Sequence, residues 1–292
     1  MPAPHDLPDA AEVATLAGLG AVAVASIPGF SLPSGWLRVM GSLPPAPGLA
    51  IVGARGADPY GLELAGRIAR AAVERGVWVI SGGAFGVDAA AHEAALATGG
   101  STVAVLGAGL DRPAPASHRG LFRRILDAGG GVASPFPCGQ GAARWTFPRR
   151  NPWIAGLARA VVVVQAGLGS GTLHTARAAL ASQTPVFVVP GPFDSPLHAG
   201  CHALVAEGAR LLTAVDGWCD EARPAERVAR SPAFGQALWR ACATEARPLA
   251  ELAAAAGLTA GEAMAQATAL ELAGWLRSAP GGRYARAQPE EA

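Results

Sequence analysis

The sequence predicts an α/β fold: a Rossmann-like, doubly wound, mostly parallel sheet, followed by a small C-terminal winged-helix domain. Two observations carry this prediction. From residue 48 onward, short and continuously apolar runs alternate with stretches of helical character, a pattern typical of parallel strands that are buried on both faces. After residue 233 the pattern changes to three helical segments and a hairpin.

Five apolar runs are the predicted strands of the sheet. They are LAIVGA (49–54), VWVIS (77–81), STVAVLG (101–107), AVVVVQA (160–166) and TPVFVVPG (184–191). Helical stretches separate most of them, and one such stretch ends at Gly99 and Gly100, residues that favour a helix stop. This alternation predicts strands with helices on both faces.

Changes in composition along the chain divide it into four parts. We expect an N-terminal extension with one helix at 1–45, the Rossmann-like domain at 46–216, a polar linker at 217–232 and the winged helix at 233–287. In the last part, Thr259 and Glu262 form an S/T-x-x-E capping box at the start of the third helical segment. That segment carries no arginine, so the winged helix is expected to bind a protein partner rather than duplex DNA.

Charge is distributed unevenly along the chain. The formal net charge is +1, and the sequence contains no lysine, so every basic residue is arginine. Between Arg112 and Arg159, however, eight arginines face a single acid, Asp127. A local basic patch of this kind predicts a polyanionic partner.

Several classes of protein are disfavoured. The four cysteines are scattered without a CxxC pair, which indicates a reduced, cytoplasmic protein. No apolar run approaches the ~20 residues of a membrane span, and the first residues lack the basic region of a secretory signal. His198, Cys201 and His202 lie close together but lack a fourth ligand, so no metal is expected.

Glycine-rich loops follow the predicted strands, among them GARGADPYG (53–61), SGGAFGVD (81–88) and AGLGSGTLHT (166–175). Backbone amides at such strand-to-helix turns bind phosphate. The loops match neither the dinucleotide fingerprint nor the Walker P-loop, which requires a lysine. An anion-binding sheet edge without a resident cofactor is therefore predicted.

The stretch RWTFPRRNPW (144–153) interleaves aromatic rings with arginines. Single-stranded nucleic acid is bound by this combination, because arginines pair with the backbone while rings stack on unpaired bases. Trp145 and Phe147 are the candidate stacking residues. The alternative is that the rings fill the core beneath a loop, and we favour that alternative for Trp153.

The order and spacing of IVGARGADPYG, VISGGAFGVDAAAHEAAL, FPRRNPWIAGL, SGTLHTA and VFVVPG resemble the DNA-processing protein A family (DprA, also called Smf) over roughly residues 48–287. The resemblance implies a non-enzymatic, homodimeric protein that binds single-stranded DNA. It also implies that the protein protects incoming DNA and loads the recombinase RecA during natural transformation.

With the resemblance, the loops and arginines give a predicted set of DNA-binding residues. Arg55, Arg149 and Arg150 are expected to clamp phosphates, and 170–172 to offer amides and hydroxyls to a further phosphate. The full predicted set is Gly53, Arg55, Ser81, Gly82, Arg149, Arg150, Asn151, Ser170, Gly171 and Thr172, with Trp145 and Phe147 as stacking candidates.

Four positions depart from the pattern of the family. Phe85 and Pro152 stand where arginines are expected, Gln165 replaces a glutamate, and His202 replaces an asparagine. Two outcomes are consistent with these changes. Either the DNA contacts have moved to Arg55 and Arg149, or DNA binding is weakened.

Two alternatives use the same loops. One is a nucleotide phosphoribohydrolase resembling the "lonely guy" enzymes, but Thr175 stands where their PGGxGTxxE signature requires a glutamate. Asp88 and His92, one helical turn apart, are the nearby acid–base pair, and Asp88 is more simply a carboxylate at a helix N-terminus. The other alternative is a nucleotide sensor without catalysis.

Overall fold

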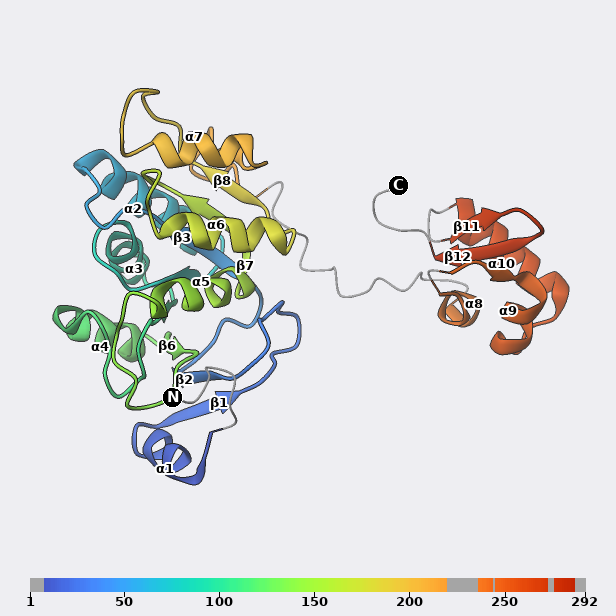
Figure 1. The fold of residues 1–292 in the computed structure, drawn as a ribbon, viewed down its shortest axis with the longest axis horizontal. Coiled ribbons are helices and arrows are strands. Elements are labelled where there is room, and N and C mark those ends of the chain that lie inside the picture. The colour runs from blue at the N-terminus through green and yellow to red at the C-terminus, as the bar shows by residue number, and fades with distance from the viewer. Residues whose placement is uncertain (1–7, 220–235, 244, 273–275, 287–292) are drawn as a thin grey trace. The chain divides into compact units, whose positions relative to one another are not determined.

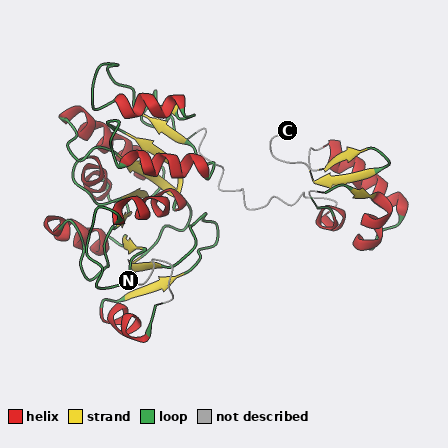
Figure 2. Cartoon of the chain, viewed as in Figure 1, coloured by secondary structure: helices red, strands yellow, loops and turns green. Residues whose placement is uncertain are grey.

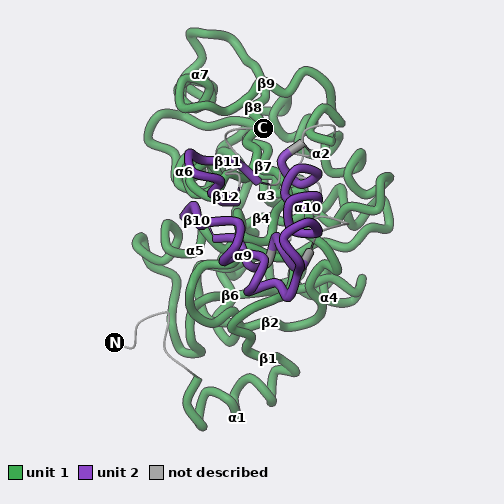
Figure 3. Tube along the Cα trace, turned by 90° about the vertical axis from the view of Figure 1, so that its right-hand side faces the viewer, with its two compact units in different colours: residues 1–225 green, residues 226–292 purple. Residues whose placement is uncertain are grey.

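The computed structural model describes residues 8–219, 236–243, 245–272 and 276–286. The chain divides into unit 1, residues 1–225, and unit 2, residues 226–292 (Figure 3). Residues 220–232 of the predicted linker lie outside the described residues.

A single sheet forms the centre of unit 1 (Figures 1 and 2). Seven neighbouring strands, from β6 to β9 in spatial order, are parallel, while β1 and β2 add an antiparallel edge. The described strands, in spatial order, are β1 (Ala21–Val24), β2 (Leu37–Gly41), β6 (Gly131–Ser134), β5 (Thr102–Val105), β4 (Val79–Ser81), β3 (Gly48–Val52), β7 (Ala158–Val163), β8 (Val186–Val188) and β9 (Arg210–Leu211). The predicted mostly parallel α/β sheet is confirmed.

Helices cover both faces of this sheet (Figure 2). Because side chains alternate along a strand, Leu49 and Ile51 of β3 pack with one helical layer, and Ala50 and Val52 pack with the other. The first layer holds α2 (Pro59–Glu74) and α3 (Val87–Ala97), continued by α1 (Ala10–Gly18) and α4 (Arg119–Asp127); the second holds α5 (Thr146–Gly156), α6 (Thr172–Ala181) and α7 (Ala199–Ala206). A short 3₁₀ helix, η1 (Ala116–His118), precedes α4.

The N-terminal residues belong to the sheet. The helix expected within 1–45 is α1, which Asp9 caps by accepting a hydrogen bond from the amide of Glu12. The strands β1 and β2 were not predicted. Leu37 and Val39 of β2 are buried in the core, so this segment completes the sheet edge beside β6.

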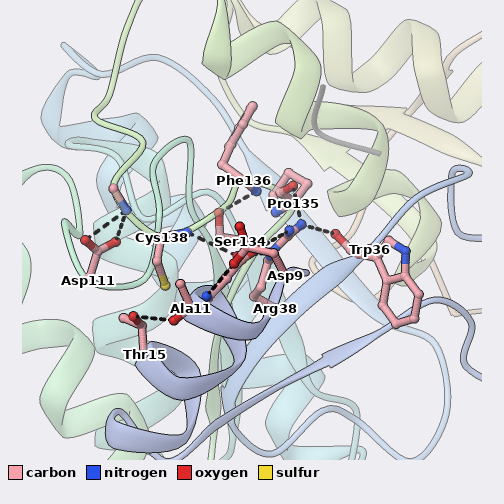
Figure 4. Close-up of polar contacts among 12 residues, drawn as sticks. Asp9, Ala11, Thr15, Trp36, Arg38, Asp111, Ser134, Pro135, Phe136 and Cys138 are labelled. Carbon is pink, nitrogen blue, oxygen red and sulfur yellow. Dashed lines mark hydrogen bonds and ion pairs between the residues drawn. The ribbon is translucent and has the colours of Figure 1, made fainter. Parts of the chain in front are cut away.

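A buried ion pair ties α1 to β2. Arg38 is 2% exposed, and its Nε and Nη2 donate to the two carboxylate oxygens of Glu12 at 2.8 and 3.0 Å. Its Nη1 donates to the carbonyls of Pro135 and Trp36 (Figure 4). The amide of Cys138 donates to Glu12 as well. One carboxylate thus joins the helix, the strand and the segment after β6.

Unit 2 has the predicted winged-helix elements. Its described residues form α8 (Gln236–Ala241), β10 (Arg247–Pro248), α9 (Leu249–Ala256), α10 (Ala260–Leu272), β11 (Leu276–Ala279) and β12 (Arg283–Arg286). Gly257 ends α9 in the left-handed region with φ of 67°. The predicted capping box is confirmed: the Thr259 amide donates to the Glu262 carboxylate, and the Glu262 amide donates to the Thr259 hydroxyl.

The strand order creates a topological switch point between β3 and β7. From β3 the chain moves outward on one side through β4, β5 and β6, and it then returns to place β7 on the other side of β3. The segments that leave the carboxyl ends of β3 and β7 therefore diverge. In open α/β sheets this divergence forms the crevice in which ligands bind.

Candidate nucleic-acid interface

A cavity of about 650 Å³ lies at this switch point. Four parts of the chain build it: the loop after β3, the loop between β4 and α3, the segment that leads into α5 with α5 itself, and the loop between β7 and α6 with the start of α6. The residues that line it are Val52, Gly53, Ala54, Arg55, Ala84, Asp88, Arg144, Phe147, Pro148, Arg150, Asn151, Ile154, Gly167, Gly169, Ser170, Gly171, Thr172, His174 and Thr175.

Arg55 and Phe147 form a cation–π pair in the wall of the cavity. The guanidinium carbon of exposed Arg55 lies 4.7 Å from the centroid of the Phe147 ring. Phe147 is half-buried, and its ring packs so closely on Gly107 that a Cβ there would lie 2.8 Å from it. The arginine is thus held against a fixed ring, with its charge available to a ligand.

Arg149 and Trp145 form a second such pair outside the residues that line the cavity. The Arg149 guanidinium lies 5.3 Å from the Trp145 ring centroid, and both side chains are exposed. Trp145 also packs edge-on against buried Phe136 at 5.7 Å. The interleaved sequence therefore places one arginine–aromatic pair in the cavity and another beside it on α5 and its lead-in.

Arg150 lies in the cavity wall, yet it is buried and engaged by the protein. Its Nη1 donates to the carbonyls of Gly82 and Val105, and its Nε donates to the side-chain oxygen of Asn151. Burial lowers the pKa of Arg150 to about 10, against the attraction of Asp88, so it remains cationic at neutral pH. A Cβ at Gly82 would lie 2.3 Å from Nη1, so a larger residue there would displace the Arg150 guanidinium. Arg150, which was expected to bind a phosphate, therefore uses its guanidinium to hold the surrounding backbone in place.

Asp88 supplies the counter-charge beneath the cavity. Its Oδ2 accepts hydrogen bonds from the amides of Gly82 and Ala84 at 3.1 and 3.2 Å. Burial raises the pKa of Asp88, while the charge of Arg150 and these hydrogen bonds oppose the rise. The carboxylate thus fixes the loop after β4, which is its expected role at the start of α3.

The loop at 167–172 partly satisfies its own polar groups. The Thr172 hydroxyl donates to the Gly53 carbonyl at 3.0 Å, and the Thr172 amide donates to the Ser170 hydroxyl oxygen at 3.2 Å. The Asn151 side chain donates to the Gly171 carbonyl. Within the described part of the chain, the amides of Gly169 and Gly171 donate to no group. Of the predicted cradle at 170–172, Gly171 therefore offers an amide without a partner among the described residues, and Gly169 adds one from outside the predicted set.

Among the remaining residues of the predicted set, some line the cavity and others only stabilise the strands and loops around it. Gly53 lines the cavity, whereas neither Ser81 nor Gly82 does. The Ser81 hydroxyl is fully buried and donates to the Ile51 carbonyl at 2.6 Å, which ties β4 to β3. The predicted set omitted Arg144 and His174, two exposed cavity-lining residues; the first belongs to the conspicuous arginine-rich stretch, but the second has no sequence signal.

The departures from the family pattern occupy defined places. Gln165 is fully buried and forms two hydrogen bonds with Asp58, which caps α2. Pro152 lies within α5. His202 contacts the Gly191 carbonyl at 3.2 Å. Phe85 is 49% exposed next to the cavity-lining Ala84.

The two residues of the candidate acid–base pair do not both line the cavity, since Asp88 does and His92 does not. His92 is fully buried, contacts the Thr102 hydroxyl at 2.7 Å, and does not line the cavity. Trp153 is a core residue, as favoured above. Within the described residues, no group of three metal-ligating side chains occurs, and no helix combines the length and apolarity that crossing a membrane requires.

Comparison with known proteins identifies the family. The model of the DNA recombination-mediator protein A family matches residues 32–223, and the model of the DprA winged-helix domain matches residues 222–282. The first match covers more than half of the chain and includes every element that lines the cavity.

Individual relatives agree with these matches. Protein Smf of Escherichia coli K12 is 37% identical over 250 residues, which cover 80% of this chain and 66% of the relative. A Mycobacterium tuberculosis relative that carries the DprA name is 48% identical over 167 residues, 57% of this chain and 43% of the relative. The chain thus spans less than two thirds of the length of these relatives.

Solved structures give the same result. DNA processing protein A of Streptococcus pneumoniae superposes with a TM-score of 0.58 at 34% identity, over 65% of this chain and 67% of that one. The Helicobacter pylori protein, whose structure was described for its single-stranded DNA binding mode, gives 0.60 at 26% identity, over 69% of this chain and 94% of that one. From its fold, its cavity and these matches, the chain belongs to the DNA recombination-mediator protein A (DprA/Smf) family of DNA-processing proteins.

Proposed function

We propose that this chain binds single-stranded DNA at the β3/β7 switch point, as a recombination mediator. The observation that carries the proposal is the pairing of Arg55 with Phe147 in the cavity wall. A cation and a ring held together offer a phosphate contact and a surface for an unpaired base, which are the two needs of single-strand binding. A duplex keeps its bases stacked and paired, so it cannot use the ring.

In this proposal some cavity residues bind DNA, and others hold the loops in place. Arg55 and Arg144 face the cavity with exposed side chains and bind phosphates, and Arg149 continues the basic surface on α5. The amides of Gly169 and Gly171 add neutral donors to a phosphate. Arg150 and Asn151 hold the loops in place from below. In this arrangement the missing arginines at 85 and 152 are offset by Arg55, Arg144 and Arg149.

The partners follow from membership of the family. We infer that the DNA-bound protein loads a RecA-type recombinase and protects incoming DNA in natural transformation, that it acts as a homodimer, and that it does so in the cytoplasm. These inferences rest on kinship rather than on a surface of this molecule. Unit 2 is proposed to bind a protein partner, because α10 carries glutamates and no arginine.

No reaction is proposed for the cavity. Asp88 is the carboxylate among the residues that line it, and its hydrogen bonds to the amides of Gly82 and Ala84 and to the Ser81 side chain hold it within the protein. Thr175, at the position where a phosphoribohydrolase would need a glutamate, is buried. The same cavity would also accept the phosphates of a free nucleotide, so nucleotides serve as competitors in the test below.

The test measures the affinity of Arg55→Ala and Arg149→Ala for a fluorescent single strand at several salt concentrations. Each lost phosphate contact is expected to weaken binding and to reduce the slope of log affinity against log salt by about 0.7. Arg67→Ala is the matched control, because Arg67 is an exposed arginine on α2 that does not line the cavity. Arg150 is avoided because its loss would damage the fold.

If both variants keep the affinity and salt slope of the wild type, the cavity is not the DNA site. Competition by a mononucleotide at equal phosphate concentration would instead support a nucleotide sensor.

A further inference from the structure

We propose that Phe85 is a base-stacking residue that forms a further nucleotide subsite next to the cavity, with Arg119 and Arg123 as its phosphate contacts. The proposal rests on the proposed single-strand binding and extends it along the strand. It assigns a function to a ring that stands where the family pattern has an arginine.

Phe85 does not itself line the cavity, but it lies in the chain between two residues that do. Ala84 and Asp88, on either side of it in the loop and first turn of α3, both line the cavity. Gly86 has a φ of 74°, and a Cβ there would lie 2.2 Å from the Ala54 carbonyl oxygen. The loop that carries Phe85 is thus packed directly on the loop that carries Arg55.

The ring is held in place while much of it stays exposed. Phe85 packs edge-to-face on His118 with ring centroids 4.6 Å apart, and His118 packs on Phe122 at 6.3 Å. A ring nitrogen of His118 lies 3.0 Å from the Gly83 carbonyl. Phe85 nevertheless remains 49% exposed. A ring fixed in this way loses little conformational freedom when a base stacks on it.

The charges beyond Phe85 suit the next phosphates of a strand. Arg119 follows His118 directly, and Arg123 lies one turn further along α4. Both are exposed, and among the described residues neither forms an ion pair. By contrast, Arg124 on the same helix is paired with Glu93. Two arginines that form no ion pair within the described part of the chain therefore lie on the helix whose start supports Phe85.

The chemistry of this subsite differs from that of an arginine. An arginine at position 85 would bind a phosphate, so its contribution would fall with salt and would not depend on the base. A phenylalanine contributes through stacking, which requires a base and is insensitive to salt. Position 85 has thus exchanged a backbone contact for a base contact, and this difference can be measured.

The experiment uses the full chain and an oligonucleotide of ~12 nucleotides, within the range of known single-strand site sizes. Phe85→Leu keeps apolar packing on His118 but removes the aromatic face, Phe85→Tyr keeps that face, and Phe85→Arg restores the family residue. Tyr60→Leu removes an equally exposed aromatic on α2 that does not line the cavity. Each protein is titrated with the intact strand and with strands that carry one abasic residue at successive positions.

We expect Phe85→Leu to weaken binding by about 5- to 150-fold at unchanged salt slope, while Phe85→Tyr and Tyr60→Leu bind as the wild type does. At one position the abasic residue should weaken the binding of the wild type by the same factor. The affinity of Phe85→Leu for that abasic strand should equal its affinity for the intact strand. Phe85→Arg should raise the salt slope by about 0.7 and abolish the abasic effect.

The proposal is overturned if the wild type binds the strand tightly and Phe85→Leu binds it equally well. It is also overturned if Phe85→Leu weakens binding by the same factor on every abasic strand. A wild type without salt-dependent binding would instead refute the proposed function itself. Melting temperatures of all variants identify any loss that comes from unfolding.

Discussion

His92 shows how burial fixes a protonation state. It is fully buried between α3 and β5. The Thr102 hydroxyl donates to the Val79 carbonyl, so its oxygen accepts from His92 and places the proton on Nδ1. Nε2 is buried and has no hydrogen-bond partner among the residues that the structure describes. Burial therefore lowers the pKa of His92 from 6.5 to about 3.

This shift predicts a pH dependence of stability. Between pH 6.5 and 3 the unfolded chain binds a proton at His92 that the folded chain does not bind, so the free energy of unfolding falls as the pH decreases. From pH 7 to pH 5 this group should account for a loss of about 2 kcal/mol. In His92→Asn, which keeps a donor to Thr102, that part of the loss should vanish.

Urea unfolding of both proteins at the two pH values measures the difference. The cavity that the smaller side chain leaves lowers stability equally at both pH values and cancels. A loss on acidification that is the same for both proteins would show that His92 does not titrate between the two states.

At the residue scale, the sequence predicted which side chains lie at the cavity better than it predicted the contacts that they form. The arginine–aromatic stretch and the glycine loops do meet at the cavity. The burial of Arg150 and Ser81 could not be predicted, because it depends on which carbonyls of distant strands approach them. Spacing along one strand or helix carries no information on such contacts between elements.

Among the elements, α1 depends on one carboxylate. The Arg38–Glu12 pair is almost completely buried, whereas the Arg124–Glu93 pair is exposed. A buried charge that loses its partner remains desolvated, while an exposed one is solvated by water. The same type of ion pair should therefore have very different effects on stability.

We expect Glu12→Ala to lower the free energy of unfolding by about 3–5 kcal/mol, because it leaves the Arg38 charge buried and unpaired. Glu93→Ala is the matched control and should cost less than about 1 kcal/mol. Urea denaturation measures both. Equal losses for the two variants would show that α1 is not anchored through Arg38.

The strands that lie within the five apolar runs were predicted, and β1, β2 and β6 were not. The five apolar runs correspond to β3, β4, β5, β7 and β8. The strand β6 was missed because its four residues, GVAS, include a glycine and only one strongly apolar side chain. The strands β1 and β2 lie in a segment rich in proline and glycine. They are stabilised by pairing rather than by their own composition, since β2 pairs with β6 and β1 pairs with β2.

At the scale of the whole molecule, the place of the cavity follows from the topology of the sheet. The chain leaves β3 on one side and returns to β7 on the other, so the loops after these two strands diverge and open a cavity. The arginine-rich segment that leads into α5 forms part of the wall of this cavity. The sequence predicted the parallel sheet and the ligand edge, but the strand order, and hence which two loops face each other, needed the structure.

The central claim is that this cavity binds single-stranded DNA through phosphates and stacked bases. The most direct measurement is a titration of the full chain with a fluorescent single strand over a series of salt concentrations, with duplex DNA and mononucleotide as competitors. We predict that binding weakens steeply with salt and that duplex and mononucleotide displace the strand poorly. In Arg55→Ala the slope of log affinity against log salt should be smaller. Binding that is independent of salt, or that duplex or mononucleotide displaces as well as single strands do, would contradict the account.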